Sequence, residues 1–190
     1  QTYIYMISIY RKTVTDKIIQ KIDTPQKGAW IFAVEPTEDE INYMVEQLKL
    51  ERGHITDALD PYETPRLETE EKDSYVYLRF PAQQDEHMIT MPILFVIRED
   101  TIVTVLRKAN PIFDDFIDER TKIPTTQKTK FLISAFLKIN ALYRDYLSSI
   151  NRNIRAKRDL LENVTQKDIV DFVRLEDILN DFITSLVPAG

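Results

Sequence analysis

The sequence of 190 residues contains no cysteine, which excludes disulfide bonds and zinc sites built from thiolates. It has only two histidines, His54 and His87, and because neither lies in a metal-ligand spacing, both are interpreted as isolated surface residues. The three glycines, at positions 28, 53 and 190, lie too far apart to form a phosphate-binding loop. No Gly-x-Ser-x-Gly motif is present, and no histidine is placed to activate a hydroxyl nucleophile. Carboxylates are therefore the main candidates for any chemistry.

Long hydrophobic runs are missing as well, since no apolar stretch approaches the roughly 20 residues that a transmembrane helix requires. The amino-terminal stretch lacks the basic start and the small-residue cleavage site of a signal peptide. The net charge of −6 argues against a nucleic-acid-binding surface and mildly favours cation binding. This charge is uneven, because residues 126–190 carry a net charge of +2 and the first 125 residues carry −8.

The first two-thirds of the sequence predict a mixture of strands and helices. β-Branched and aromatic residues predict a strand over Tyr3–Tyr10 and a short buried strand at residues 30–34. Alternating hydrophobicity then predicts four more strands, at 66–72, 74–80, 88–97 and 101–107. The last two are expected to form a hairpin, and Pro92 indicates an edge position or a bulge.

Helix signals separate these strands. Thr37 and Glu40 form a capping box, so a helix is expected to begin there and to end near Gly53. A second short helix is expected to run to Leu59, and Asn110-Pro111 is expected to begin a third.

The sequence changes character after Pro124, because no proline or glycine occurs from residue 125 to residue 187. A heptad-like seam predicts a helix over about Gln127–Glu162, roughly 50 Å long. The seam residues are Leu132, Phe136, Ile139, Tyr143, Tyr146 and Ile150. A return helix is expected from about Gln166, with Thr165 as its cap. The predicted fold is thus α/β (more strictly α+β): residues 1–124 form a mixed sheet sandwiched by helices, and residues 125–190 form a long antiparallel helical hairpin.

One turn concentrates carboxylates that could bind a hard cation. Mg²⁺ keeps most of its water and needs only one or two carboxylates, so Asp57 is a candidate ligand, with Asp60 or Glu63 as a second. The same turn carries a sequence resemblance. The resemblance rests on Trp30-Ile31, then PTEDEI, then DALDPYETPRLE followed by YVYLRFP. Through these motifs the chain resembles the cytoplasmic domain of CorA-type magnesium transport proteins over nearly its whole length.

This resemblance implies a non-enzymatic function. Members of the family are homopentameric ion channels of the inner or plasma membrane, with this domain in the cytoplasm and long helices that lead to a stalk and pore. Mg²⁺, the transported ion, also binds between neighbouring cytoplasmic domains and holds the channel closed; Co²⁺ and other divalent cations are further candidates. The family's interface aspartate, eight residues before the proline of the turn, corresponds to Asp57, and Asp60 is the second metal candidate.

The chain departs from the family in three places. Thr56 and Leu137 stand where some members carry the acids of a second ion site. The Gly-Met-Asn pore signature does not occur up to Gly190.

Three alternatives stay open. The first is a related transporter of zinc or another divalent ion. The second is a soluble helical adaptor or oligomerisation protein without a pore. The third is a carboxylate-dependent hydrolase.

Overall fold

The computed structural model describes residues 7–84 and 87–158, together with Val173, Glu176 and Asn180. The elements follow in the order β1 (Ile7–Arg11), β2 (Gln20–Ile22), β3 (Ala29–Val34), α1 (Glu38–Glu46), α2 (Arg52–Leu59), β4 (Arg66–Glu70), β5 (Asp73–Gln84), β6 (His87–Ile97), β7 (Thr101–Leu106), α3 (Asp114–Ile117) and α4 (Lys128–Arg158). The predicted strand residues 3–6 and the predicted return helix from Gln166 with its cap lie outside the described residues, apart from the three single positions.

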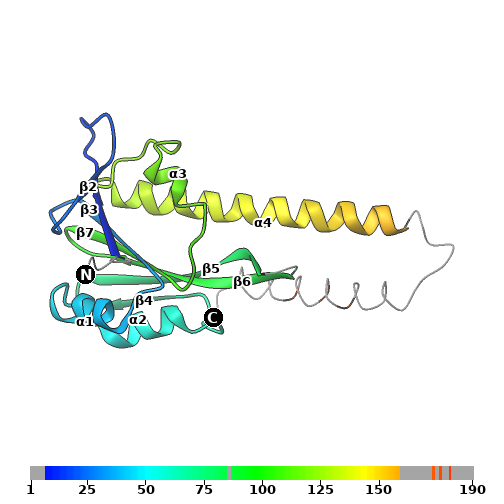
Figure 1. Cartoon of the computed structure of the whole chain (residues 1–190), viewed down its shortest axis with the longest axis horizontal. Coiled ribbons are helices and arrows are strands. Elements are labelled where there is room, and N and C mark those ends of the chain that lie inside the picture. The colour runs from blue at the N-terminus through cyan, green and yellow to red at the C-terminus, as the bar shows by residue number, and fades with distance from the viewer. Residues whose placement is uncertain (1–6, 85–86, 159–172, 174–175, 177–179, 181–190) are drawn as a thin grey trace, which may run out of the picture.

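The described strands form one seven-stranded mixed sheet in the order β2-β1-β3-β7-β6-β5-β4. Strands β3 and β7 pair in parallel, and every other neighbouring pair is antiparallel. Helices α1 and α2 cover one face of the sheet, and α3 and α4 cover the other (Figure 1). The predicted fold class, a mixed sheet between helices with a long helix at its carboxyl end, is confirmed.

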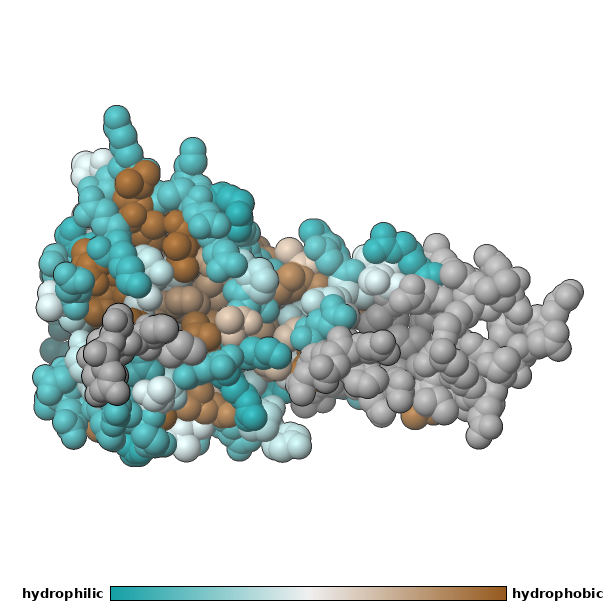
Figure 2. Space-filling model, viewed as in Figure 1, coloured by the Kyte–Doolittle hydropathy of each residue, from teal (hydrophilic) through white to brown (hydrophobic). Residues whose placement is uncertain are grey.

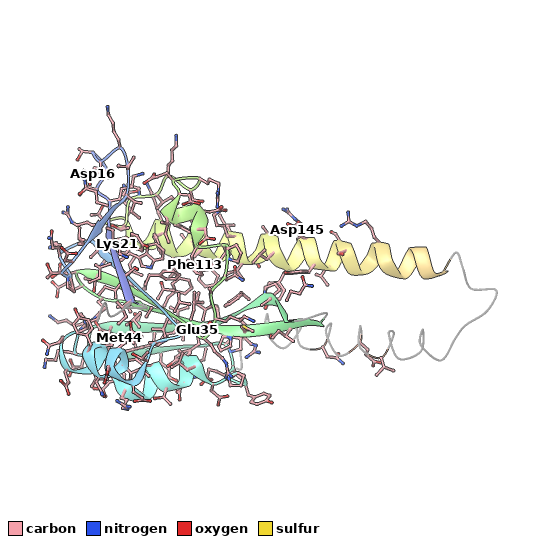
Figure 3. The ribbon with its side chains drawn as sticks, in the orientation of Figure 1. Asp16, Lys21, Glu35, Met44, Phe113 and Asp145 are labelled. Carbon is pink, nitrogen blue, oxygen red and sulfur yellow. The ribbon has the colours of Figure 1, made fainter. Side chains whose placement is uncertain are left out.

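The central strand β3 is buried on both of its faces, which explains its uninterrupted apolar sequence. Ile31 and Ala33 pack with Met44 of α1 in one core, whereas Trp30 packs with Phe113 and other aromatic rings in the other. Figure 3 shows Met44 and Phe113 on opposite sides of the sheet. Two separate hydrophobic cores therefore hold the two helical layers onto one sheet.

The predicted start of α1 is confirmed, but its predicted end is wrong. Thr37 accepts a hydrogen bond from the Glu40 amide, and the Glu40 carboxylate accepts one from the Thr37 amide. The helix ends before Gly53, and Lys49, at φ 57°, lies in the connection to the next helix. Gly53 instead lies in the first turn of α2, where tertiary packing offsets its low helix propensity.

The predicted strands at 66–107 are confirmed, including the β6–β7 hairpin. The interpretation of Pro92 as an edge residue is wrong for the whole strand, since β6 lies between β5 and β7. At Pro92 itself, however, the side of β6 that faces β7 is unpaired, because β6 pairs with β7 only from Ile93 to Ile97. Pro92 therefore lies one residue beyond that ladder, where the missing N–H breaks no bond to β7.

The long helix α4 packs on the sheet through one stripe and then extends past it (Figure 1). The fully buried side chains are Phe131, Ala135, Ile139 and Tyr143, spaced by four residues. The predicted seam contains two of these, while its members Leu132 and Phe136 flank the stripe and are only partly buried. The third predicted helix also starts later than expected: Asn110 caps a turn through the Ile112 amide, and α3 begins at Asp114.

No helix in the described ranges combines the length and hydrophobicity needed to span a membrane. On the face shown in Figure 2, hydrophilic side chains cover most of the sheet-containing part, with hydrophobic ones between them. Exposed large hydrophobic side chains include Val14, Ile18 and Leu137.

The entry to α4 is fixed by the buried hydroxyl of Thr125. Its Oγ1 accepts a hydrogen bond from the Lys12 amide at 2.8 Å and donates to the Gly28 carbonyl. Gly28 has φ +80°, and a Cβ there would lie 2.4 Å from the Thr126 methyl group. Glycine is thus required by both the backbone conformation and the close approach of the segment that leads into α4.

We predict that Thr125→Val lowers the free energy of unfolding by about 1–3 kcal/mol, because the isosteric side chain leaves the Lys12 amide without its partner. Urea unfolding followed by circular dichroism measures this change. Thr129→Val is the matched control, since Thr129 is exposed on α4 and its replacement is expected to change stability by less than about 0.5 kcal/mol. Equal effects of the two variants would show that the Thr125 hydroxyl does not anchor the helix.

Candidate functional site

The carboxylate-rich turn connects α2 to the edge strand β4. Asp60 caps the carboxyl end of α2, and its backbone amide donates to the Asp57 carbonyl at 3.0 Å. The Asp60 side chain accepts a hydrogen bond from the Tyr62 amide at 2.9 Å, which is an Asx-turn arrangement. Asp60 therefore shapes the turn, as expected of an aspartate before Pro61.

Arg66, the first residue of β4, collects the carboxylates around it. Its Nη2 donates to Asp57 Oδ2 at 2.7 Å, its Nη1 pairs with Glu63, and its Nε pairs with Glu68. The guanidinium also lies over the Tyr77 ring, 3.8 Å from the centroid. Glu63, a candidate cation ligand in the sequence, is therefore paired with Arg66, as are Asp57 and Glu68.

The charges of these four side chains do not balance, since three carboxylates share the guanidinium of Arg66 and the group carries a net charge of −2. Burial alone would lower the pKa of Arg66, but its contacts with Glu68, Glu63 and Asp57 raise that pKa above the usual value. Arg66 therefore stays charged, and the surplus negative charge attracts a cation. The Asp57 side chain, 45% exposed, is accessible to such an ion.

A second arginine fixes the backbone of the turn to the sheet. Arg79 of β5 donates through Nη1 to the carbonyls of Pro61 and Glu63, at 2.9 and 2.7 Å. Its Nε and Nη2 donate to the hydroxyl and the carbonyl of Thr90, both at 2.7 Å. The Arg79 carbonyl accepts from Tyr143 of α4 at 3.1 Å, so the turn is linked through one residue to the long helix on the other face. Sequence reasoning missed the role of Arg79, because the alternating pattern of its strand predicts the strand but not the contacts of this side chain.

His54 does not lie on the surface, so that prediction is wrong. It is 7% exposed, because α2 packs its imidazole against the Tyr75 ring at a centroid distance of 3.7 Å. Its Nδ1 lies 2.6 Å from the Tyr77 hydroxyl, and its Nε2 lies 3.3 Å from Glu70 Oε1. One ligand atom each from His54, Glu68 and Glu70 lie within 4.8 Å of one another. Sequence reasoning missed this group because His54 lies in α2, more than ten residues before the two glutamates of β4.

Burial raises the pKa of the Tyr77 phenol far above its usual value, and the nearby carboxylates of Asp57, Glu68 and Glu63 add to this effect, although Arg66 opposes it. Tyr77 therefore keeps its proton at physiological pH and has one hydrogen bond to donate. The two positions that differ from the family pattern are not acidic: Thr56 donates its hydroxyl to the Arg52 carbonyl at 2.9 Å, and Leu137 is an exposed residue of α4.

Comparison with known proteins places the chain in a family. The sequence model described as CorA-like Mg²⁺ transporter protein matches residues 25–186. No curated protein sequence matches the chain.

Among solved structures, the soluble domain of CorA from Methanocaldococcus jannaschii superposes with a TM-score of 0.81 at 16% identity, covering 96% of this chain and 75% of that one. The complete CorA magnesium transporter of the same organism gives 0.80 at 15% identity, covering 95% of this chain and 59% of that one. The chain thus spans about three-fifths of that transporter. The ZntB cytoplasmic domain from Vibrio parahaemolyticus gives 0.64 at 13% identity, covering 80% of this chain and 64% of that one.

We predict that Arg66→Lys lowers the free energy of unfolding by about 1–2 kcal/mol, because one ammonium group cannot reproduce a guanidinium fork directed at three carboxylates. Thermal and urea unfolding measure the loss, which added NaCl should reduce by screening the carboxylate repulsion. Arg52→Lys is the control, since Arg52 pairs with Glu38 at an exposed site and its replacement should cost no more than about 0.5 kcal/mol. A loss at Arg66 no larger than at Arg52 would contradict a central role for this cation.

Proposed function

Since the chain belongs to the family of CorA-like Mg²⁺ transporter proteins, as the match over residues 25–186 establishes, we propose that it is the Mg²⁺-sensing part of a divalent-cation channel. In this proposal residues 1–124 form the cytoplasmic sensor, and residues 125–190 form helices that lead toward a membrane-embedded pore. The regulatory ion binds Asp57 and bridges neighbouring subunits of a homopentamer. Mg²⁺ is both the sensed and the transported ion.

The observation that supports this proposal most directly is the environment of Asp57. The residue lies at the carboxyl end of α2, where an acidic side chain opposes the helix dipole at a cost of about 0.3–1 kcal/mol. Arg66 offsets this cost and orients the carboxylate at the rim of the sheet, next to the edge strand β4. An accessible, oriented carboxylate with surplus negative charge nearby suits an ion that needs only one or two protein ligands.

Shared binding explains how such an ion controls a channel. An ion held between two subunits binds only the assembled, symmetric arrangement, so its presence stabilises that arrangement and its loss shifts the population away from it. At a concentration of 100 times Kd, each site contributes about 2.7 kcal/mol to the bound state. Several symmetry-related sites together therefore exert a large bias on the closed arrangement.

A transporter of zinc or another divalent ion on the same fold is the second candidate. The similarity of the ZntB cytoplasmic domain in fold supports it, at a TM-score of 0.64. The carboxylate of Asp57 itself favours a hard ion at that position, however, because zinc prefers nitrogen and sulfur ligands.

We predict that millimolar Mg²⁺ protects the full product of the gene from limited proteolysis, and that Asp57→Asn raises the Mg²⁺ concentration needed for half-protection at least tenfold. The variant removes one ligand charge but retains an oxygen that accepts from Arg66. Gel densitometry of protease digests across a Mg²⁺ titration gives the midpoints.

Asp60→Asn is the matched control, since Asp60 shapes the same turn through its side-chain oxygen. Its midpoint should remain within about twofold of the unsubstituted protein. Equal protection of all three proteins would remove Asp57 from the sensing mechanism, and a shift in Asp60→Asn alone would assign the ion to Asp60.

A further inference from the structure

His54, Glu68 and Glu70 form a second potential ligand group that is separate from Asp57. His54 comes from α2, and the two glutamates occupy alternate positions of β4, so both point from the strand toward the helix. The Glu68 and Glu70 side chains are 40% and 50% exposed, which leaves an approach from solvent to the buried imidazole. The group thus has one nitrogen and at least two oxygen donors at a single opening.

The spacing of these atoms fits a bound ion. Two ligands about 2.0–2.1 Å from one tetrahedral zinc ion lie roughly 3.4 Å apart. His54 Nε2 and Glu70 Oε1 are separated by 3.3 Å. Glu68 offers a ligand atom that lies, like the other two, within 4.8 Å of the rest of the group, and its Oε2 is 3.8 Å from His54 Nδ1.

Tyr77 provides the outer contact that a metal-binding histidine needs. Its hydroxyl lies 2.6 Å from His54 Nδ1 and can donate to the His54 carbonyl at 3.3 Å. In that arrangement Nδ1 carries the imidazole proton and donates a hydrogen bond to the Tyr77 hydroxyl oxygen, while the Nε2 lone pair faces the Glu70 carboxylate. Two facing acceptors repel, so a cation between them stabilises this tautomer, and the contact at Nδ1 orients the ring.

We propose that His54, Glu68 and Glu70 bind a divalent transition-metal ion of the Zn²⁺ class, with water completing the coordination. Imidazole nitrogen favours Zn²⁺, Co²⁺ and Ni²⁺ over Mg²⁺, which prefers oxygen ligands and keeps its water. The site differs from Asp57 in its ligands and in its preferred ion. It does not depend on the proposed Mg²⁺-sensing role.

Zn²⁺ titration of the metal-free protein by calorimetry tests the proposal. We expect one Zn²⁺ per chain, and Glu70→Gln should weaken binding at least tenfold; this glutamate is half-exposed, so the variant retains the fold. His54→Gln should abolish the site. Glu71→Gln, at an exposed turn residue, and His87→Gln, which removes the other histidine, are controls that should bind as the unsubstituted protein does.

Co²⁺ substitution gives a second readout, because an absorption band typical of tetrahedral Co²⁺ should appear in the unsubstituted protein and disappear in Glu70→Gln. Millimolar Mg²⁺ should not displace the Zn²⁺. Absence of stoichiometric Zn²⁺ binding, unchanged affinity in Glu70→Gln, or displacement by Mg²⁺ would each overturn the proposal. Asp57→Asn should still bind one Zn²⁺ per chain, so failure here is distinguishable from failure of the sensing role.

Tyr77 acts as a positioning residue, and we predict that Tyr77→Phe weakens Zn²⁺ binding about tenfold while retaining one ion per chain. Calorimetry gives the affinity and the stoichiometry. Tyr62→Phe is the control, since Tyr62 is 86% exposed in the turn between α2 and β4 and its hydroxyl should not influence binding. Unchanged affinity in Tyr77→Phe would show that the hydroxyl does not orient the imidazole.

Discussion

The sharing of one guanidinium by three carboxylates is the interaction on which the α2–β4 corner depends. Arg66 connects the end of the helix, the following turn and the edge strand, and its guanidinium lies over the Tyr77 ring. Glu68 contributes both to this group and to the cluster around His54. Any ion that draws Glu68 toward the histidine therefore removes a partner from Arg66 and leaves that cation more fully to Asp57 and Glu63. The two proposed ion sites, which differ in their donor atoms, are thus electrostatically linked through one side chain.

The scaffold makes this linkage possible because it fixes the backbone on both sides of the corner. Arg79 binds the carbonyls of the turn and is itself held by Thr90 on the neighbouring strand β6. The central strands are buried on both faces, so the sheet resists displacement, and local charge changes act on side chains at the rim.

Features encoded by residues close together in the sequence could be predicted, whereas contacts between distant residues could not. The capping box at Thr37, the β6–β7 hairpin and the Glu63–Arg66 pair all depend on residues within a few positions of one another. The burial of His54 depends on Tyr75 and Tyr77, which reach it only because β5 and α2 pack in three dimensions. The prediction that a helix ends near Gly53 is wrong because it uses only the weak helix propensity of glycine, which the packing of α2 outweighs. The proposed ligand role of Asp57 rests on the carboxylate-rich turn and on the family resemblance.

The part of α4 that extends past the sheet acts as a lever, because a tilt of the helix at the sheet displaces its far end. Tyr143 is the last buried side chain of α4 among those that the structure describes, and the helix continues to Arg158, about 22 Å farther at 1.5 Å per residue. A tilt of about 5° at the sheet then moves the far end by roughly 2 Å, provided that the helix stays straight. Tyr143, where the tilt would occur, donates a hydrogen bond to the Arg79 carbonyl. The side chain of the same arginine holds the carboxylate-rich turn. A sub-ångström adjustment at that turn, if transmitted through Arg79, would therefore be magnified along the helix.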